Sequence, residues 1–252
     1  MNPIKNRVGE IIESNQCGPM EIVEYKNNSD IKVKFKTGTI LKTNYQSFKI
    51  GCIKDPLFPN VFEIGFMGIG KYKSSINGKH TIEYKTWQNM LKRCYDPYFI
   101  NKHLTYQDVV VCDEWLNFQN LAKWHQENYY ELLDESVHLD KDTIKIGNKV
   151  YSPEFCAFVP QSINNLLIKR DKLRGKCPIG VSFKKENNKY QAKIQINGKT
   201  KHLGYFSTQE KAFLTYKIAK EKYIKTMVNK YKDVLDIRIY DSLMQYKISI
   251  TD

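Results

Sequence analysis

The strongest constraint on the fold of this chain is the alternation of apolar and polar side chains between residues 180 and 206. Residues 190–196 read YQAKIQI, in which every second residue is apolar, the period of a strand with one buried face. The next two residues, Asn197-Gly198, are typical of a tight hairpin turn. Residues 180–185 and 200–206 have the same strand character. The segment therefore predicts three antiparallel strands.

The residues that follow change to a helical period. Ser207-Thr208-Gln209-Glu210 has the spacing of a capping box, in which side chains bond the first amides of a helix. Four apolar residues then recur at intervals of four, three and four, which predicts one buried helical stripe. They are Ala212, Tyr216, Ala219 and Tyr223.

This order of strands and helix resembles the APETALA/ethylene-response-type DNA-binding domain. Residues 190–194 (YQAKI) match the aromatic-x-Ala-x-Ile strand of that family. Residues 202–206 (HLGYF) match its Trp-Leu-Gly-x-Phe strand, with His202 in the position of the tryptophan. The resemblance implies that the open face of the sheet enters the major groove of double-stranded DNA. The chain departs from the family in His202 and in having fewer arginines.

The alternation also predicts which side chains reach that open face. Tyr190, Ala192 and Ile194 should face the helix, so the residues between them should face outward. Glutamine can pair bidentately with adenine and lysine with guanine, while other lysines contact phosphates. The alternative is a solvated sheet face without a ligand. The expected nucleic-acid-binding residues of the sheet are Lys184, Gln191, Lys193, Gln195 and His202.

The distribution of charge supports a polyanionic partner. The chain carries a net charge of +13, of which +12 lies in residues 166–252, with 20 Lys and Arg against 8 Asp and Glu. Such a bias favours nucleic acid, and the alternative is a solubilising surface. A basic linker between two modules could contact phosphates, although a plain tether is equally compatible. Its basic residues are Lys169, Arg170, Lys172, Arg174 and Lys176.

A second informative segment spans residues 137–165, which read VHLDKDTIKIGNKVYSPEFCAFVPQSINN. His138, Asp140 and Asp142 alternate and would share one face of a strand. A polar loop follows, then an apolar run at residues 155–159, and Pro160 can open a helix. The order predicted is strand, loop, strand and helix.

That order, with the Gly-Asn loop and the Tyr-Ser-Pro-Glu-x-Cys segment, resembles the ββα-metal finger of phage and intron-homing HNH endonucleases. The resemblance implies a divalent metal, Mg or Mn, held by Asp140 together with Asn164 or Asn165 at a phosphodiester. The chain departs from the family at Lys141, where the general-base histidine is expected. A lysine is a poor base at neutral pH, and His138 lies two residues too early. The expected catalytic candidates are thus His138 and Lys141, with weak or absent cleavage.

The remaining sequence completes an α+β multidomain architecture. Short strand-like segments at residues 8–13, 20–25, 31–35 and 40–48 predict a small SH3-like β module. Apolar stripes predict two helices at residues 84–95 and 115–130, after a hairpin at Asn77-Gly78. The expected domains begin with an SH3-like module at residues 1–58. A second domain at 59–168 combines a hairpin, two helices and the HNH-like finger. A basic linker (169–176), a three-stranded sheet with one helix (177–232) and a tail (233–252) follow.

Composition bears on the environment of the protein. The six cysteines include no Cys-x-x-Cys pair, which argues against a structural zinc knuckle and favours reduced thiols. No apolar run has the length of a membrane span, and the first residues show no hydrophobic signal region. We expect a cytoplasmic protein without membrane contact, in the host-cell cytoplasm if it is phage-encoded.

Two functions from different classes fit these observations. The first is a phage-type or mobile-element HNH-like DNA-binding protein that nicks DNA with a degenerate base position. The second is a catalytically inactive DNA-binding regulator or accessory factor that keeps the finger as a scaffold. A third and weaker alternative makes RNA or a protein partner the ligand, with the N-terminal module as the contact surface.

Overall fold

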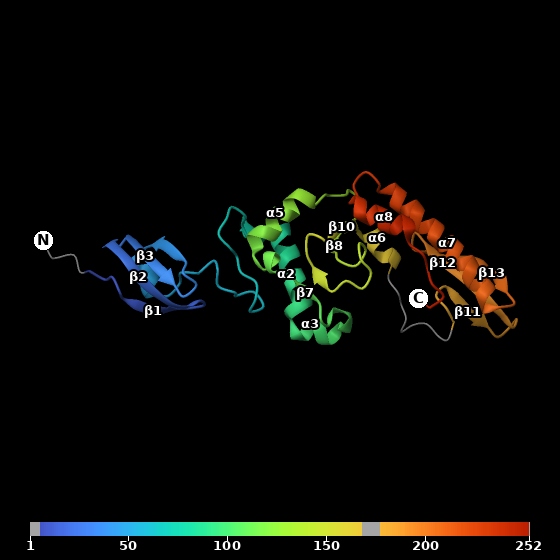
Figure 1. Ribbon diagram of the computed structural model, residues 1–252, viewed down its shortest axis with the longest axis horizontal. Helices are drawn as coiled ribbons and strands as arrows, with labels where there is room; N and C mark the ends of the chain where they lie inside the picture. Colours follow the sequence, from blue (N-terminus) through green and yellow to red (C-terminus); the bar gives the residue numbers. More distant parts are fainter. Residues whose placement is uncertain (1–5, 168–176, 252) are drawn as a thin grey trace. The chain divides into compact units, whose positions relative to one another are not determined.

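The computed structural model describes residues 6–167 and 177–251, and its fold is mixed α and β (Figure 1). The chain forms two compact units. One holds Met1–Glu127 and Lys149–Ser152, and the other holds Asn128–Asn148 and Pro153–Asp252. The second unit thus joins the finger to the C-terminal sheet and tail, which the sequence analysis treats as separate segments. The basic linker of residues 169–176 lies outside the described residues.

The N-terminal part of the first unit is a four-stranded antiparallel sheet in the order β1-β2-β3-β4. Its strands are β1 (Ile11–Ser14), β2 (Gly18–Asn27), β3 (Asp30–Phe35) and β4 (Ile40–Thr43). Alternate residues of β3 are fully buried, as the sequence pattern predicts. The core of this sheet consists of Cys17, Met20, Ile22, Ile31, Val33, Phe35 and Phe48.

The fourth strand is shorter than the sequence analysis predicts. It ends at Thr43, and Tyr45–Lys49 forms the short helix α1 instead of continuing the strand. The side chain of Asn44 accepts a hydrogen bond from the Ser47 amide at 2.8 Å, which caps the helix. The turn places Phe48 in the core with no exposed surface.

The rest of the first unit is mainly helical. It contains the strands β5 (Ser75–Ile76), β6 (Lys79–His80), β7 (Val110–Val111) and β9 (Val150–Tyr151), and β9 pairs with β7 in parallel. Its helices are α2 (Ile82–Tyr95), α3 (Pro97–Lys102), η1 (Leu104–Tyr106), α4 (Asp113–Leu116) and α5 (Phe118–Asn128).

The predicted helix at residues 115–130 is in fact two helices. The backbone of Phe66 accepts a hydrogen bond from the Phe118 amide at 2.9 Å and donates one to the Leu116 carbonyl at 3.0 Å. These bonds hold Asn117 in an extended conformation between α4 and α5. A chain segment fifty residues away therefore interrupts a helix that local periodicity predicts as continuous.

The second unit begins with the finger. Strands β8 (Val137–Asp140) and β10 (Ala157–Pro160) pair antiparallel, and α6 (Gln161–Asn164) and η2 (Asn165–Leu167) follow directly. The predicted order of strand, loop, strand and helix is present. Between the strands, the chain leaves this unit to contribute β9 to the first one.

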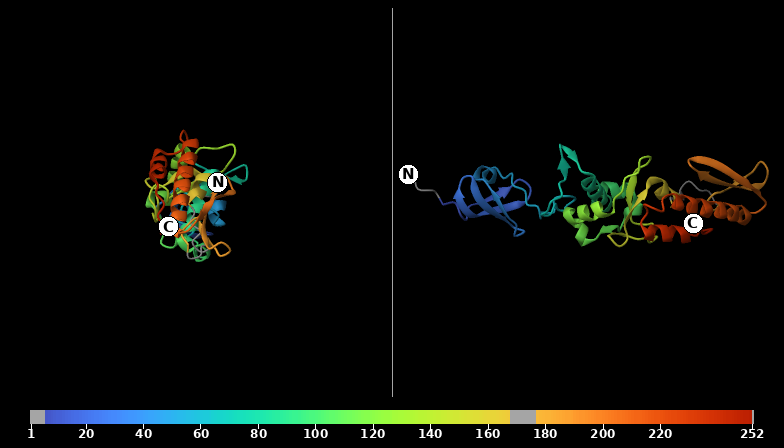
Figure 2. Two further views of the ribbon diagram at one scale, coloured as in Figure 1. Left: turned by 90° about the vertical axis from the view of Figure 1, so that its right-hand side faces the viewer. Right: turned by 90° about the horizontal axis from the view of Figure 1, so that it is seen from above.

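The C-terminal sheet has the order β11-β12-β13, with all neighbours antiparallel. Its strands are β11 (Val181–Lys184), β12 (Lys189–Ile196) and β13 (Lys199–Phe206). Asn197 and Gly198 form the predicted tight turn, with φ values of 49° and 76°. Helix α7 (Gln209–Lys230) lies along one side of the sheet (Figure 2), and Thr208 caps it as expected.

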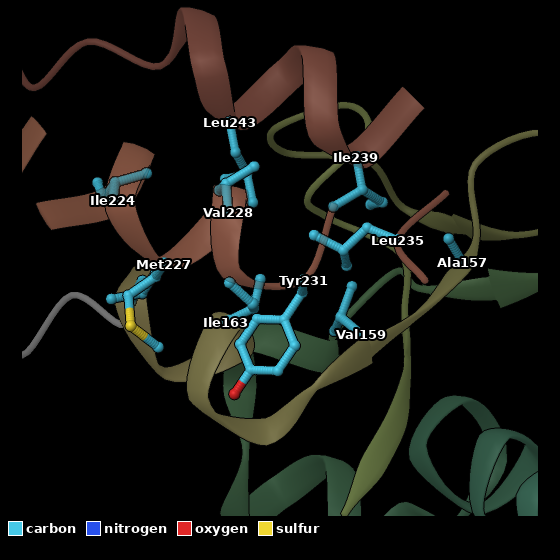
Figure 3. Packing of buried hydrophobic residues seen from close by; sticks show 11 residues of the cluster. Ala157, Val159, Ile163, Ile224, Met227, Val228, Tyr231, Leu235, Ile239 and Leu243 are labelled. Atoms are coloured by element: carbon cyan, nitrogen blue, oxygen red, sulfur yellow. The ribbon is translucent and has the colours of Figure 1, made fainter. Parts of the chain in front are cut away.

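Helix α7 contributes buried residues to two hydrophobic cores. Its first half buries Ala212, Phe213 and Tyr216 against the sheet. Its second half packs against the finger and against α8 (Ile237–Gln245), which the sequence analysis leaves as an unassigned tail (Figure 3). The buried residues of this second core are Ala157, Val159, Ile163, Leu166, Ile224, Met227, Val228, Tyr231, Leu235, Ile239 and Leu243. Neither α7 nor any other helix in the described ranges has the length and apolar character of a membrane span.

The tail should therefore be needed for stability. We expect Ile239→Ala, at a side chain with no exposed surface, to lower the free energy of unfolding by about 2–5 kcal/mol through the lost packing and the cavity left behind. Ile237→Ala is the matched control, because Ile237 lies on the same helix and is 66% exposed. Its effect should stay below about 0.5 kcal/mol. Urea denaturation of the full chain measures both, and equal effects would contradict the packing of α8.

Candidate nucleic-acid interface and finger

The open face of the C-terminal sheet carries a row of polar side chains. The register places Lys193 opposite His202 and Gln191 between Ser182 and Tyr205. Residues opposite one another in an antiparallel pair lie on the same face. Ala192 and Ile194 face α7 and are buried, so Gln191, Lys193 and Gln195 project from the other face, as the alternation predicts.

The position of His202 depends on an irregularity in β13. The register shifts between Ala192 and Lys193, where the partner strand holds an extra residue at Leu203. Gly204 has a φ of 142°, a conformation that favours glycine. A one-residue insertion of this kind keeps Leu203 with the core and turns His202 to the open face. Without it, strict alternation from Phe206 would direct His202 toward the helix.

The structure adds residues that the sequence analysis does not name. Tyr205 is 46% exposed, and its ring lies 4.6 Å from the ring of His202. Ser182 and Thr200 share the open face through their pairing with Gln191 and Gln195. Alternation from Phe206 already turns Tyr205 outward, but only the extra residue at Leu203 brings His202 to the same face beside it. Lys184 lies opposite Lys189 at the end of the face next to the turn at Asn188.

The face is basic and rich in hydrogen-bonding groups. Lys193, Gln195 and His202 are exposed, and Gln191 and Lys184 are partly buried. The Gln195 side-chain amide donates to the Gly198 carbonyl at 3.3 Å. Within the described part of this unit, α7 packs on the opposite side of the sheet. Lysine and amide side chains on an uncovered sheet match the donors and acceptors that the major groove presents.

The finger places two of its predicted site residues on one face. In β8, His138 lies opposite Val159 and Asp140 lies opposite Ala157, so both share the side of the strand pair that meets the core around α6. Leu139, between them, is on the other side with Phe158. His138 Nε2 lies 2.8 Å from the Ser136 hydroxyl. Of the three residues expected on one strand face, His138 and Asp140 share it, whereas Asp142 lies beyond the end of β8, in the loop.

The carboxylate of Asp140 organises the loop that follows β8. Its Oδ2 accepts hydrogen bonds from the amides of Asp142 at 3.0 Å and Thr143 at 2.7 Å. A carboxylate offers about four acceptor positions, so these bonds leave Asp140 with capacity for a cation. Oxygen ligands of this kind suit Mg or Mn. The residue fits a metal but also has a structural task.

The two asparagines predicted as metal ligands lie where the finger helix ends. Asn164 is the last residue of α6 and is partly buried, whereas Asn165 is exposed. The side-chain oxygen of Asn165 accepts a hydrogen bond from the side-chain nitrogen of Gln161 at 2.9 Å. Among residues 6–167 and 177–251, no cluster of three or more His, Cys, Asp or Glu side chains could hold a metal ion. The predicted ligands are Asp140 with Asn164 or Asn165, and a search for His, Cys, Asp and Glu does not count asparagine, so this finding does not test the prediction.

Lys141, at the position expected for a general base, has a role inside the loop. Its side chain is only 7% exposed, and its ammonium donates to the Asn148 carbonyl at 2.9 Å and to Asp142 at 2.7 Å. Asn148 in turn donates from its side chain to the Lys141 carbonyl at 2.9 Å. An ammonium has donors and no acceptor. In this arrangement the Lys141 side chain closes the loop, with its donors directed at the Asn148 carbonyl and the Asp142 carboxylate.

Helix α6 is held by a residue far away in sequence. Pro160 precedes the helix and has no side-chain cap, so the Ser162 amide donates to Glu135 at 2.8 Å. The hydroxyl of Tyr231, at the end of α7, also donates to Glu135. Burial raises the pKa of the Glu135 carboxyl, but the hydrogen bonds from Tyr231 and Ser162 outweigh it and lower the pKa. One carboxylate thus ties the finger helix to α7.

No family model matches the chain, and neither the curated proteins nor the solved structures give a match. The resemblances to HNH endonucleases and to the APETALA/ethylene-response domain accordingly rest on the residues alone.

The structural role of Lys141 can be tested by stability. Lys141→Ala should lower the free energy of unfolding by about 1–3 kcal/mol, because it removes a buried hydrogen bond to the loop backbone. Asp142→Ala should cost less than about 1 kcal/mol, since Asp142 is 54% exposed and its ion pair with Lys141 is screened by solvent. Chemical denaturation distinguishes the two. A larger effect for Asp142→Ala would show that the ion pair, and not the backbone bond, holds the loop.

Proposed function

We propose that this chain is a double-stranded DNA-binding protein that contacts DNA through the open face of its C-terminal sheet. The observation that carries the proposal is the register that brings Lys193 and His202 side by side on the face opposite α7, with Gln191 and Gln195 along the same strand. The net charge of +12 in residues 166–252 adds attraction for phosphates. The sheet would lie in the major groove, with its amide side chains directed at base edges.

The finger then acts as a scaffold. Lys141 and Asn148 form reciprocal hydrogen bonds inside the loop, and the Asp140 carboxylate binds two loop amides. This use of its polar groups favours the regulator or accessory-factor alternative over efficient cleavage. RNA and a protein partner at the SH3-like N-terminal module remain the weaker alternative. A cytoplasmic location, in a phage-infected host cell if the chain is phage-encoded, belongs to the same proposal.

Substitution of Lys193 tests the interface. Lys193→Ala should weaken binding to duplex DNA about 5- to 150-fold, which corresponds to about 1–3 kcal/mol for a contact to a base. Lys222→Ala is the matched control, because Lys222 is an exposed lysine of α7, the helix that packs on the other side of the sheet. Fluorescence anisotropy with a labelled duplex measures both affinities. Equal losses for the two variants would contradict an interface on the open face.

A second candidate function is metal-dependent DNA nicking. The observation in its favour is the order β8, β10 and α6, with Asp140 on the strand face that meets the core around the helix. There Asp140, with Asn164 or Asn165, would hold Mg or Mn, which stabilises charge on the leaving oxygen. His138 is the residue in the finger that could accept a proton from water.

A plasmid assay separates the scaffold from the nuclease. With Mg or Mn, we expect the wild type and Asp140→Asn to nick supercoiled plasmid at the same background rate, because the side chain at the expected base position, Lys141, is buried in hydrogen bonds to the loop. Retained duplex binding by Asp140→Asn is the folding control. Metal-dependent nicks that the wild type makes and the variant does not would establish the nuclease and would direct attention to His138.

A further inference from the structure

The β5–β6 hairpin of the first unit is held firmly but contributes nothing to a core. Its two strands are joined by Asn77 and Gly78, both with positive φ, as a tight turn requires. None of the residues 75–80 is buried, and Ile76 at the tip is 59% exposed. A two-stranded hairpin of this size is marginal by itself in water. Its order must come from its attachment.

The attachment is made by the side chain of Gln119 in α5. Its oxygen accepts a hydrogen bond from the Tyr72 amide at 2.9 Å, and its nitrogen donates to the carbonyls of Tyr72 at 3.0 Å and Met67 at 3.2 Å. The amide thus pairs with the backbone as a neighbouring strand would. The Tyr72 hydroxyl also donates to Gln126 at 2.9 Å. These four bonds fix the chain entering the hairpin to α5.

The chain leaving the hairpin is fixed to α2. The Thr81 hydroxyl donates to the Lys73 carbonyl at 3.1 Å and accepts from the Tyr84 amide at 3.3 Å, so it closes the hairpin and caps the helix. The ring of His80 lies 4.8 Å from the ring of Tyr84. The hairpin is therefore preorganised at both ends, while none of the side chains of residues 75–80 is buried.

The charges on and beside the hairpin have one sign. Residues 71–85 contain four lysines and a single acidic residue, Glu83. The four are exposed and make none of the ion pairs found among the described residues. They are Lys71, Lys73, Lys79 and Lys85. A rigid, exposed ribbon of this charge is complementary to nucleic-acid phosphates, and the major groove can admit a two-stranded ribbon.

We infer that the β5–β6 hairpin is a second contact to duplex DNA, made chiefly with the phosphate backbone. The inference rests on the proposed function and extends it from the C-terminal sheet to the first unit. Phosphate contacts release counterions, so each adds about 0.9 to the slope of log affinity against log salt concentration. The hairpin then raises affinity and salt dependence and leaves base selection to the sheet.

The test is a salt titration of binding with the full chain. The probe is a labelled duplex of about 25 base pairs, which is about two and a half helical turns. The variant Lys71→Ala/Lys73→Ala/Lys79→Ala should weaken binding at least tenfold at moderate salt and reduce the slope by about 2–3. Because these side chains are exposed, its melting temperature should equal that of the wild type.

The matched control is Lys34→Ala/Lys36→Ala/Lys49→Ala. These three exposed lysines lie in β3, in the turn after it and in α1, and they make no ion pair among the described residues. It removes the same charge and should leave the slope within about 0.5 of the wild type. An equal fall in slope for control and hairpin variants would overturn the inference, since bulk charge would explain both. So would a hairpin variant that binds like the wild type. Absence of duplex binding by the wild type itself would instead overturn the proposed function.

Discussion

The burial of the second half of α7 is the interaction on which the finger depends. Helix α6 has four residues and β8 and β10 have four each, far below what is stable in isolation. Val228 and Ile224 pack with Val159 and Ile163, all with at most 1% exposed surface. Each such side chain contributes about 1.5–3 kcal/mol on burial. The finger therefore acquires its stability from a helix that begins in the C-terminal sheet.

Sharing one helix has a consequence for function. The face of α7 that supports the sheet is buried with Ala192 and Ile194, whereas Lys193 and His202 lie on the other side of the same strands. A ligand on the open face therefore needs no rearrangement of either core. The Arg238 guanidinium of α8 also ties the tail to the chain before β10, because it pairs with Asp236 and donates to the carbonyls of Glu154 and Cys156. A fixed support of this kind favours recognition by preformed strands.

The sequence predicted correctly those elements whose hydrogen bonds and turns involve residues close together in the chain. The alternation of Tyr190 to Ile196, the turn at Asn197-Gly198 and the cap at Thr208 all act within a few residues, and the structure has each of them. The features that the sequence did not disclose depend on distant partners. Asn117 is extended because the Phe66 backbone pairs beside it, and α6 is capped by Glu135, twenty-seven residues away. Periodicity carries no information about such bonds.

The finger shows the same limit at the level of chemistry. A motif position identifies a residue type, but the reactivity of that residue depends on what its atoms bind. Lys141 stands where the resemblance to HNH endonucleases implies a general-base histidine, yet its ammonium is buried against the Asn148 carbonyl. Charge is subject to the same reasoning. The first 165 residues have a net charge of only +1, but residues 71–85 contain four lysines and a single acidic residue, Glu83. A nearly neutral total is therefore compatible with a local surface that attracts phosphates, and the fold determines where that surface forms.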